Sequence, residues 1–274
     1  MTSTVADKRA AFAKLHQAGC FALPNPYDAG TAIALQRLGF NAVATTSAGM
    51  AWSMGRADGG AGLEEVLAHL AGVAAAVDIP VNADFEGGLA VAPDAVAANV
   101  ARAAQTGIAG LSIEDSSGDA ASPLYDLNLA VERIAAARQA IDRSGPGVVL
   151  TARSEGFVAG RPDLAETIRR LVAFSEAGAD CLYAPGLREA SDISEVVRAV
   201  APKPVNVLTL GQSLAELTDL GVRRVSVGGS LARVAWGAFL AAAREIKESG
   251  TFSAFAKGAS GRDLNAMFAQ HGPR

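Results

Sequence analysis

Two carboxylates stand two residues apart at the end of a short apolar run, in residues 81–88 (VNADFEGG). Alternate residues of an extended strand share one face, so we expect Asp84 and Glu86 to point the same way where the strand ends. Like charges at this spacing repel each other unless a cation or a proton lies between them. Because Mg2+ prefers one or two carboxylates together with water and substrate oxygens, the pair predicts a divalent-cation site for Mg2+, with Mn2+ as an alternative.

Further polar side chains are expected at the same place, because the carboxyl ends of the strands of a barrel meet at one face. Asp58, Glu114 and Arg153 follow or end neighbouring predicted strands, so four acids in all accompany one arginine. A divalent cation held by these acids would chelate an α-oxo acid through its carboxylate and carbonyl oxygens, and Arg153 would bind a carboxylate or phosphonate through two hydrogen bonds. The arrangement predicts a site that stabilises an enolate.

A loop of small and hydroxyl-bearing residues follows the second predicted strand, with Thr45 at the strand end and Ser47, Ala48 and Gly49 after it. Small side chains let backbone N–H groups approach a substrate carboxylate. Asn206, on the seventh predicted strand, adds an amide to the same rim. Loops are polar in general, which accounts for part of these residues, but not for acids on the third and fourth strands beside an arginine on the fifth.

The elements that position these residues are eight short apolar segments that alternate with amphipathic helical patterns. The segments lie near residues 21, 42, 80, 110, 148, 181, 204 and 224. Strands that alternate with helices indicate right-handed crossovers and a parallel sheet. Eight of them in 274 residues favour an α/β fold of the (β/α)8 barrel type over an open dinucleotide-binding sheet, and no GxGxxG motif follows the first strand.

We expect one barrel domain over residues 1–274, with a leading helix in 1–18 and a helical extension in 231–274. The extension carries phenylalanines that need burial, and a second copy of the chain is one place to find it. A homo-oligomer is therefore predicted.

Composition argues against several other classes of protein. Lys and Arg number 24 against 28 Asp and Glu, a formal net charge of -4, which gives no basic surface for nucleic acid. Cys20 and Cys181 lack the spacing of a zinc or disulfide framework, so a reducing, cytoplasmic location is predicted. No apolar run is long enough to cross a membrane, and the N-terminus has no apolar signal segment.

Six segments, in this order and spacing, resemble the isocitrate lyase and phosphoenolpyruvate mutase superfamily. They are NPYDAGTA, TTSAGMA with Asp58 downstream, VNADFEGG, LSIED, LTARSE and PVNV. The resemblance runs from about Phe21 to Ser230. It implies an α/β barrel whose last helix is exchanged between subunits, in dimers or tetramers, and magnesium-dependent chemistry on the enolates of α-oxo acids.

The resemblance also implies roles for individual residues. Asp84 corresponds to the direct metal ligand, while Asp58, Glu86 and Glu114 correspond to residues that hold the waters of the metal. The residues predicted to bind the metal, directly or through its waters, are Asp84, Glu86 and Glu114. The predicted catalytic residues are Asp58, Glu114 and Arg153. The residues predicted to bind substrate are Thr45, Ser47, Ala48, Gly49, Asp84, Arg153 and Asn206.

The chain departs from its relatives in the loop after the fourth strand. Lyases of isocitrate and 2-methylisocitrate carry their catalytic cysteine there, and phosphoenolpyruvate mutases carry a lysine-bearing gating loop. Residues 116–123 (SSGDAASP) contain no cysteine, lysine or histidine, and Gly186 replaces a glutamate that those lyases place after the sixth strand. Members that resemble oxaloacetate decarboxylase need neither loop, because loss of carbon dioxide requires mainly an electron sink.

The sequence therefore predicts a magnesium-dependent lyase that cleaves a C–C bond of, or decarboxylates, a small α-oxo dicarboxylate such as oxaloacetate. Two alternatives stay open. One is phosphorus–carbon chemistry on phosphonopyruvate or phosphoenolpyruvate, and the other is an α-oxo acid binding protein that has lost catalysis together with its acid loop.

Overall fold

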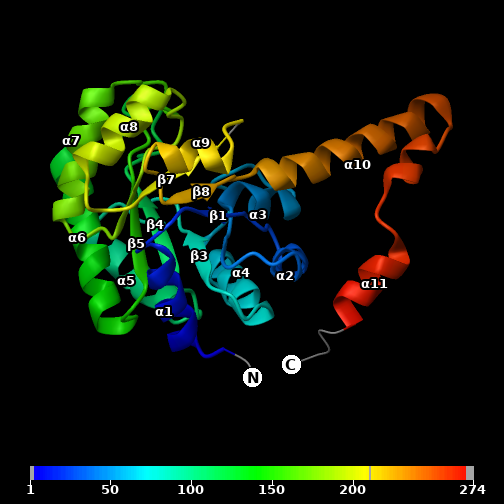
Figure 1. Ribbon diagram of the computed structural model, residues 1–274, viewed down its shortest axis with the longest axis horizontal. Coiled ribbons are helices and arrows are strands. Elements are labelled where there is room, and N and C mark those ends of the chain that lie inside the picture. Colours follow the sequence, from blue (N-terminus) through cyan, green and yellow to red (C-terminus); the bar gives the residue numbers. More distant parts are fainter. Residues whose placement is uncertain (1–2, 210, 270–274) are drawn as a thin grey trace.

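Eight parallel strands form a barrel in the computed structural model, which describes residues 3–209 and 211–269 (Figure 1). The strands are β1 (Phe21–Leu23), β2 (Val43–Ala44), β3 (Val81–Asp84), β4 (Gly110–Glu114), β5 (Val149–Arg153), β6 (Cys181–Tyr183), β7 (Val205–Leu208) and β8 (Arg224–Ser226). Each lies at one of the eight predicted positions, so the predicted (β/α)8 fold is confirmed.

The sheet closes on itself at the contact between its first two strands. The paired order runs β1-β8-β7-β6-β5-β4-β3-β2. Between β1 and β2, the Ala44 N–H donates to the Pro24 carbonyl at 3.0 Å, and the Asn25 amide donates to the Thr45 carbonyl at 2.9 Å. This short seam completes the ring and brings the loop after β1 against the end of β2.

Helices cover the outside of the barrel and connect its strands. They are α1 (Val5–Leu15), α2 (Ala29–Arg37), α3 (Ser47–Ser53), α4 (Leu63–Ala76), α5 (Pro93–Ala104), α6 (Leu127–Ser144), α7 (Leu164–Glu176), α8 (Ala190–Ala199) and α9 (Leu214–Asp219). Side-chain caps fix where several begin; for example, the Asp28 carboxylate accepts from the Thr31 N–H at 2.7 Å at the start of α2. In the described residues no helix is both long and apolar enough to cross a membrane.

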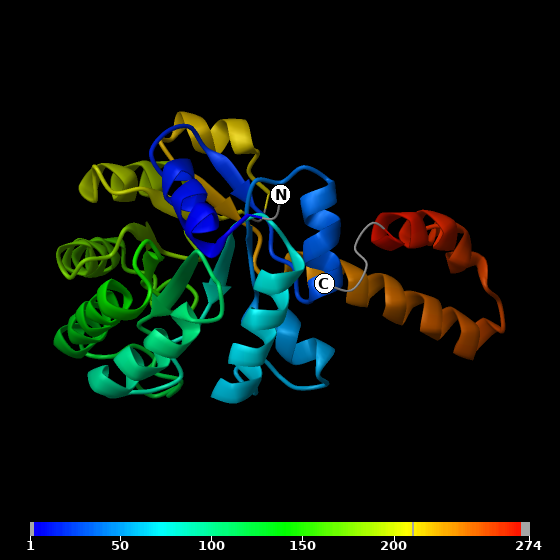
Figure 2. The same cartoon turned by 90° about the horizontal axis from the view of Figure 1, so that it is seen from below.

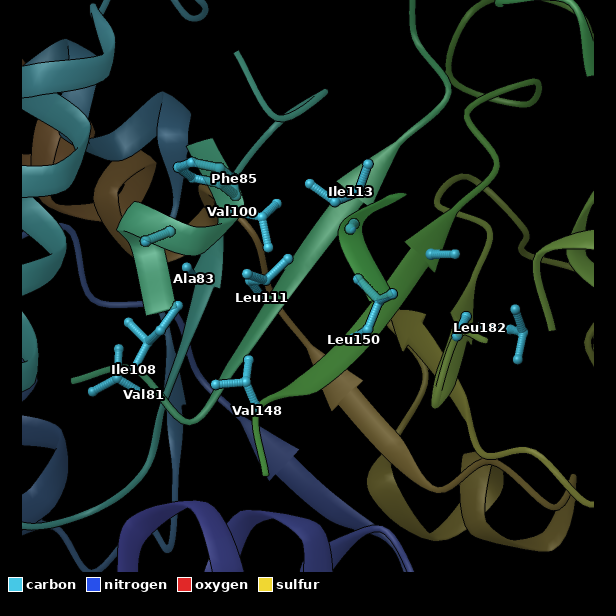
Figure 3. Packing of buried hydrophobic residues seen from close by; sticks show 14 of the residues in the cluster. Val81, Ala83, Phe85, Val100, Ile108, Leu111, Ile113, Val148, Leu150 and Leu182 are labelled. Atoms are coloured by element: carbon cyan, nitrogen blue, oxygen red, sulfur yellow. The ribbon is translucent and has the colours of Figure 1, made fainter. Parts of the chain in front are cut away.

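Successive residues of a barrel strand face alternately outward, toward the helices, and inward, toward the barrel interior. Outward-facing residues such as Val81, Leu111 and Leu150 pack beneath the helices (Figure 3). The residues between them, including Asn82 and Ser112, face the barrel interior and line a cavity there. On β3 and β4 the period of two thus places apolar residues outside the ring and polar residues inside it.

The amino end of the barrel is closed by Phe12 of α1, which is fully buried against Phe21 and Val149. Gly110 is required beneath it, because a Cβ at this position would lie 2.6 Å from the Phe12 ring and 2.7 Å from the Asn82 Oδ1. The predicted leading helix is therefore the plug of the barrel, and its first two residues lie outside the described part of the chain.

The C-terminal segment leaves the barrel. It comprises α10 (Ser230–Ser249), the 3-10 turn η1 (Ser253–Lys257) and α11 (Gly261–Ala269), and both views show α10 projecting away from the strands (Figures 1 and 2). Of the 20 residues of α10, only Ala232 is buried. The predicted extension thus forms helices, except for residues 270–274, which lie outside the described residues; its exchange between subunits stays a prediction.

Candidate active site at the carboxyl ends of the strands

Arg153, the last residue of β5, forms ion pairs with three carboxylates. Its Nη1 lies 2.8 Å from Asp84 Oδ1, its Nη2 3.1 Å from Glu114 Oε2, and its Nε 2.8 Å from Glu155 Oε1. The strand register explains the contact with Glu114, because Glu114 of β4 is directly paired with Arg153 of β5. Burial alone lowers the pKa of Arg153, but the charges of Glu114, Glu155 and Asp84 raise it well above its ordinary value. The guanidinium is thus a permanent positive charge at the centre of the predicted site.

Asp84 also anchors the small-residue loop after β2. Its Oδ2 accepts from the Ser47 N–H at 2.9 Å and from the Ser47 hydroxyl at 3.0 Å. The Asp84 N–H in turn donates to Thr45 Oγ1 at 2.9 Å. Gly49 fits tightly, since a Cβ there would lie 2.7 Å from the Thr46 side chain and 2.8 Å from that of Tyr27. The structure therefore brings the predicted loop and the predicted acid into direct contact.

Glu86 lies at the site, but the expected strand alternation is not what places it there. The strand ends at Asp84, and Glu86 lies in the following turn with a left-handed φ of +47°, so strand alternation does not place it. Its carbonyl accepts from the Glu114 N–H at 3.0 Å, which ties the turn to the neighbouring strand. A non-glycine residue in this region is strained, and such strain is held only where the surroundings enforce it.

The acids of this rim are crowded. Burial, followed by the charges of Asp84 and Asp58, raises the pKa of Glu86 to about 7. Burial is also the main cause of the raised pKa of Glu114; Arg153 opposes it, while Glu155, Asp84 and Glu86 add to it. Asp58 itself is exposed in the loop after α3, with its side chain at the edge of the site. A cation among these groups would relieve their repulsion.

The donor chemistry fits a hard divalent ion. Asp84, Glu86 and Glu114 offer carboxylate oxygens, which Mg2+ and Mn2+ prefer to softer ligands. Among residues 3–209 and 211–269, no group of three or more His, Cys, Asp or Glu side chains converges closely enough to enclose a metal without help. A magnesium site needs no such cage, because water and substrate oxygens complete its shell.

Two hollows meet at this rim and share Ser47, Asp58, Arg153 and Glu155. The inner one is a cavity of about 240 Å3 that descends into the barrel and contains Asp84 and Asn206 in its wall. The outer one, of about 590 Å3, is lined by Glu86 and Glu114 together with the loop after β4. All the predicted site residues except Gly49 line one of the two hollows.

The loop after β4 forms a small hairpin over the outer hollow. Ser116 bridges to Leu124, and the Ser117 N–H donates to the Pro123 carbonyl at 2.9 Å. Beneath it, Asp115 Oδ1 accepts from the Glu155 N–H at 2.8 Å, and its Oδ2 lies 3.2 Å from Nη1 of Arg170. The hairpin is therefore fastened to the strand end that carries Arg153.

Three residues of the site are additional to those predicted as catalytic, metal-binding or substrate-binding. Glu155 pairs with Arg153, the Tyr183 ring lies under the Arg153 guanidinium at 5.3 Å, and Arg224 lines the inner cavity. Burial raises the pKa of Tyr183 to about 12, so its hydroxyl stays protonated. A signal for Arg224 did exist, since it stands two residues before the rim residue Ser226 and so shares its face.

Comparison with known proteins places these features in one class. The family model of phosphoenolpyruvate phosphomutase matches residues 12–247. An uncharacterised protein of Mycobacterium tuberculosis is 37% identical over 215 residues, 78% of this chain and 79% of that protein. The chain therefore belongs to the phosphoenolpyruvate phosphomutase family, within the superfamily of isocitrate lyases and phosphoenolpyruvate mutases.

Solved structures agree with this assignment. A crystal structure from Burkholderia cenocepacia, described as a lyase/mutase, is 49% identical, with a TM-score of 0.93 over 97% of this chain and 96% of that one. A 2,3-dimethylmalate lyase is 26% identical, with a TM-score of 0.84 over 98% and 96% of the two chains. The predicted superfamily is thus confirmed, and its members are lyases and mutases, so the chain belongs to a group of enzymes.

Proposed function

We propose that this protein is a magnesium-dependent lyase that breaks a C–C bond of a small α-oxo dicarboxylate through an enolate. One observation carries the proposal: Arg153, Asp84 and the Ser47 loop line a single cavity of about 240 Å3, and Glu114 is ion-paired with the same arginine. A cavity of this size suits a small acid better than a nucleotide.

In this proposal the acids bind the metal, and the hydrogen-bond donors bind the substrate carboxylate. Asp84, with Glu86 and Glu114, would hold Mg2+ or Mn2+. When bound, the metal would act as a Lewis acid that stabilises negative charge on the oxo group as the neighbouring C–C bond breaks. Arg153 and the N–H groups of the Ser47 loop orient the carboxylate next to that oxo group. Asp58, at the mouth, and Glu114 are placed to exchange protons with the substrate through water.

Arg153 is held rigidly for this task. Its three ion pairs fix the plane of the guanidinium, and N–H groups not used by the acids remain to meet a substrate oxygen. Preorganised charge of this kind does not have to reorient during the reaction, which is why it is effective.

A turnover screen tests the proposal. The purified protein is incubated with oxaloacetate and a panel of larger α-oxo and hydroxy acids, with Mg2+ or with a chelator, and product formation is followed. We expect metal-dependent consumption of at least one acid of the panel. If no acid is consumed above the background rate, the lyase proposal is wrong.

The phosphomutase family model favours a second candidate, phosphorus–carbon chemistry, because Arg153 would bind a phosphonate as well as a carboxylate. Phosphorus NMR of mixtures with phosphonopyruvate or phosphoenolpyruvate separates it from the first. A third candidate, an α-oxo acid binding protein without catalysis, predicts tight binding with no turnover on either panel.

We also propose that the protein is a homo-oligomer. The segment from α10 to α11 exposes a series of large apolar side chains, among them Val234 (71% exposed), Phe239 (63%) and Phe255 (60%). Apolar surface of this extent is characteristic of a contact between subunits.

A further inference from the structure

Arg224 is a buried positive charge with no ion-paired acid among the described residues. It begins β8, is 2% exposed, and faces the barrel interior below the rim. Its Nε donates to Asn206 Oδ1 at 2.8 Å and its Nη2 to Thr151 Oγ1 at 3.0 Å, while its Nη1 lies 3.3 Å from His16 Nε2. In the part of the chain that the structure describes, Arg224 forms no ion pair, whereas Arg153 forms three.

The three partners of Arg224 are neutral. An amide and a hydroxyl carry no charge, and His16 accepts from Arg224 through Nε2 while its Nδ1 faces the Phe12 carbonyl at 2.8 Å. That arrangement requires the uncharged ring, in agreement with a His16 pKa that burial and the Arg224 charge lower to about 3. Buried charges are normally paired, because removing them from water is costly. The other N–H groups of this guanidinium have no hydrogen-bond partner among the residues that the structure describes.

The Arg224 side chain borders the inner cavity. Arg224 lines the same space of about 240 Å3 as Asp84 and Arg153. The wall also includes short side chains, such as those of Ala44, Ser112 and Ser226, which leave room for a ligand. Asn82, also in the wall, has an Oδ1 with no hydrogen-bond partner among the described residues. The cavity therefore has carboxylates, among them Asp84, at the strand ends, and deeper in the barrel it has Arg224, a cation with no ion pair among the described residues.

We propose that Arg224 binds a second carboxylate of the substrate, at the end of the molecule away from the oxo acid. This inference rests on the proposed function, and it adds the residue that would select a dicarboxylic over a monocarboxylic oxo acid. An arginine stabilises the carboxylate that it binds against loss as carbon dioxide, so the acid group at Arg224 is one that the reaction retains. Among the reactions of the proposed function, this favours C–C cleavage that leaves the far carboxylate in place.

Two matched pairs of acids test the proposal by binding alone. Oxaloacetate is compared with 2-oxobutyrate, and 2-oxoglutarate with 2-oxopentanoate; within each pair a methyl group replaces the far carboxylate. Binding is followed by tryptophan fluorescence immediately after mixing with Mg2+, since Trp52 lies against Gly229, a residue of the cavity wall. In the native protein we expect at least one dicarboxylate to bind about tenfold or more tightly than its partner, as one added charge-assisted pair would produce.

Variants assign the preference to Arg224. In Arg224→Met the dicarboxylate should lose about tenfold or more in affinity while the monocarboxylate changes by less than about twofold, and Arg224→Lys should keep part of the preference. Arg223→Met is the matched control, because that neighbouring side chain faces the surface and donates to the Gly19 carbonyl at 2.9 Å. It should leave both affinities unchanged.

The possible outcomes distinguish failure of this inference from failure of the proposed function. If the native protein binds both members of each pair equally, the inference is wrong and the proposed function stands; this result does not depend on the folding of any variant. An equal loss for both members in a folded Arg224→Met also contradicts it, as does inorganic phosphate binding at Arg224 with no preference between the acids. If no oxo acid binds at all, the proposed function is wrong, and so is the inference that rests on it.

Discussion

Arg153 and Arg224 show how much the same residue type differs with its surroundings. Arg153 is surrounded by three carboxylates, whereas Arg224, on the same inner wall, has only neutral partners among the described residues. The first therefore joins the strand ends into one site, while the second is available to a ligand. At the residue scale, removing Arg153 would leave three carboxylates without a compensating charge, whereas removing Arg224 would not.

Replacement of Asp84 by alanine should abolish turnover and the Mg2+ dependence of ligand binding. The residue is both the proposed metal ligand and the acceptor for Ser47, so its loss removes the cation and loosens the loop. We expect kcat/KM to fall by about a hundredfold or more. Asp94→Ala, at an exposed position on α5, serves as the control. Unchanged kinetics in a folded Asp84→Ala protein would falsify the metal assignment.

Replacement of Arg153 by lysine should act mainly on substrate binding. Lysine keeps the charge among Asp84, Glu114 and Glu155 but loses the planar fork that grips a carboxylate. We expect KM for the oxo acid to rise by about tenfold or more. A change confined to kcat would show that another group holds the carboxylate. Steady-state kinetics of Arg153→Lys beside Arg143→Lys, a change on the outer helix α6, distinguish the two.

His16 makes stability depend on pH. In the folded protein its pKa is lowered to about 3, mainly by burial, whereas in the unfolded chain it is near its ordinary value of 6.5. The unfolded state therefore binds the proton first, and stability is lost as pH falls below 6.5. Between pH 7.5 and 5.5 the free energy of unfolding should fall by roughly 1 kcal/mol more in the native protein than in His16→Gln. Urea titrations at both pH values measure the difference, and parallel losses in the two proteins would contradict this role of His16.

At the scale of elements, α1 and β4 depend on each other at the amino end of the barrel. Phe12 is fully buried over Gly110, where no Cβ fits. Gly110→Ala should lower the free energy of unfolding by about 1–3 kcal/mol, because the Phe12 ring must move.

The control for this prediction is Gly72→Ala in the middle of α4, where nothing lies within 4 Å of an added Cβ. That change should raise stability by up to about 1 kcal/mol through helix propensity. Denaturant titrations compare the two variants. Equal effects of the two changes would show that the contact between α1 and β4 carries no special weight.

At the scale of the whole molecule, the segment from α10 to α11 lacks a core of its own. Light scattering should therefore give a mass that is a multiple of the 27.8 kDa chain, two- or fourfold. Phe239→Asp on α10 should shift it toward the monomer, because a charge in an apolar contact is costly. Lys247→Ala on the same helix is the control. A native monomer at micromolar concentration would contradict the proposed oligomer.

The sequence by itself determined the barrel and most of the residues on its rim. Short apolar segments that alternate with amphipathic helical patterns locate all eight strands, and the carboxyl ends of parallel strands meet at one face, so Asp84, Glu114 and Arg153 follow from their positions. These properties are local or topological, which is why spacing along the chain reveals them.

Only the tertiary structure decided how those residues combine. Asp84 and Arg153 are 69 positions apart, and no spacing rule states that one guanidinium will bind three acids or that Glu86 reaches the rim through a left-handed turn. Nor does the sequence say that Arg224 lacks an acid partner, because that depends on every side chain that packs around it. Charge pairing and cavity shape arise from closure of the ring, which places distant strands a few ångströms apart in a medium of low polarity.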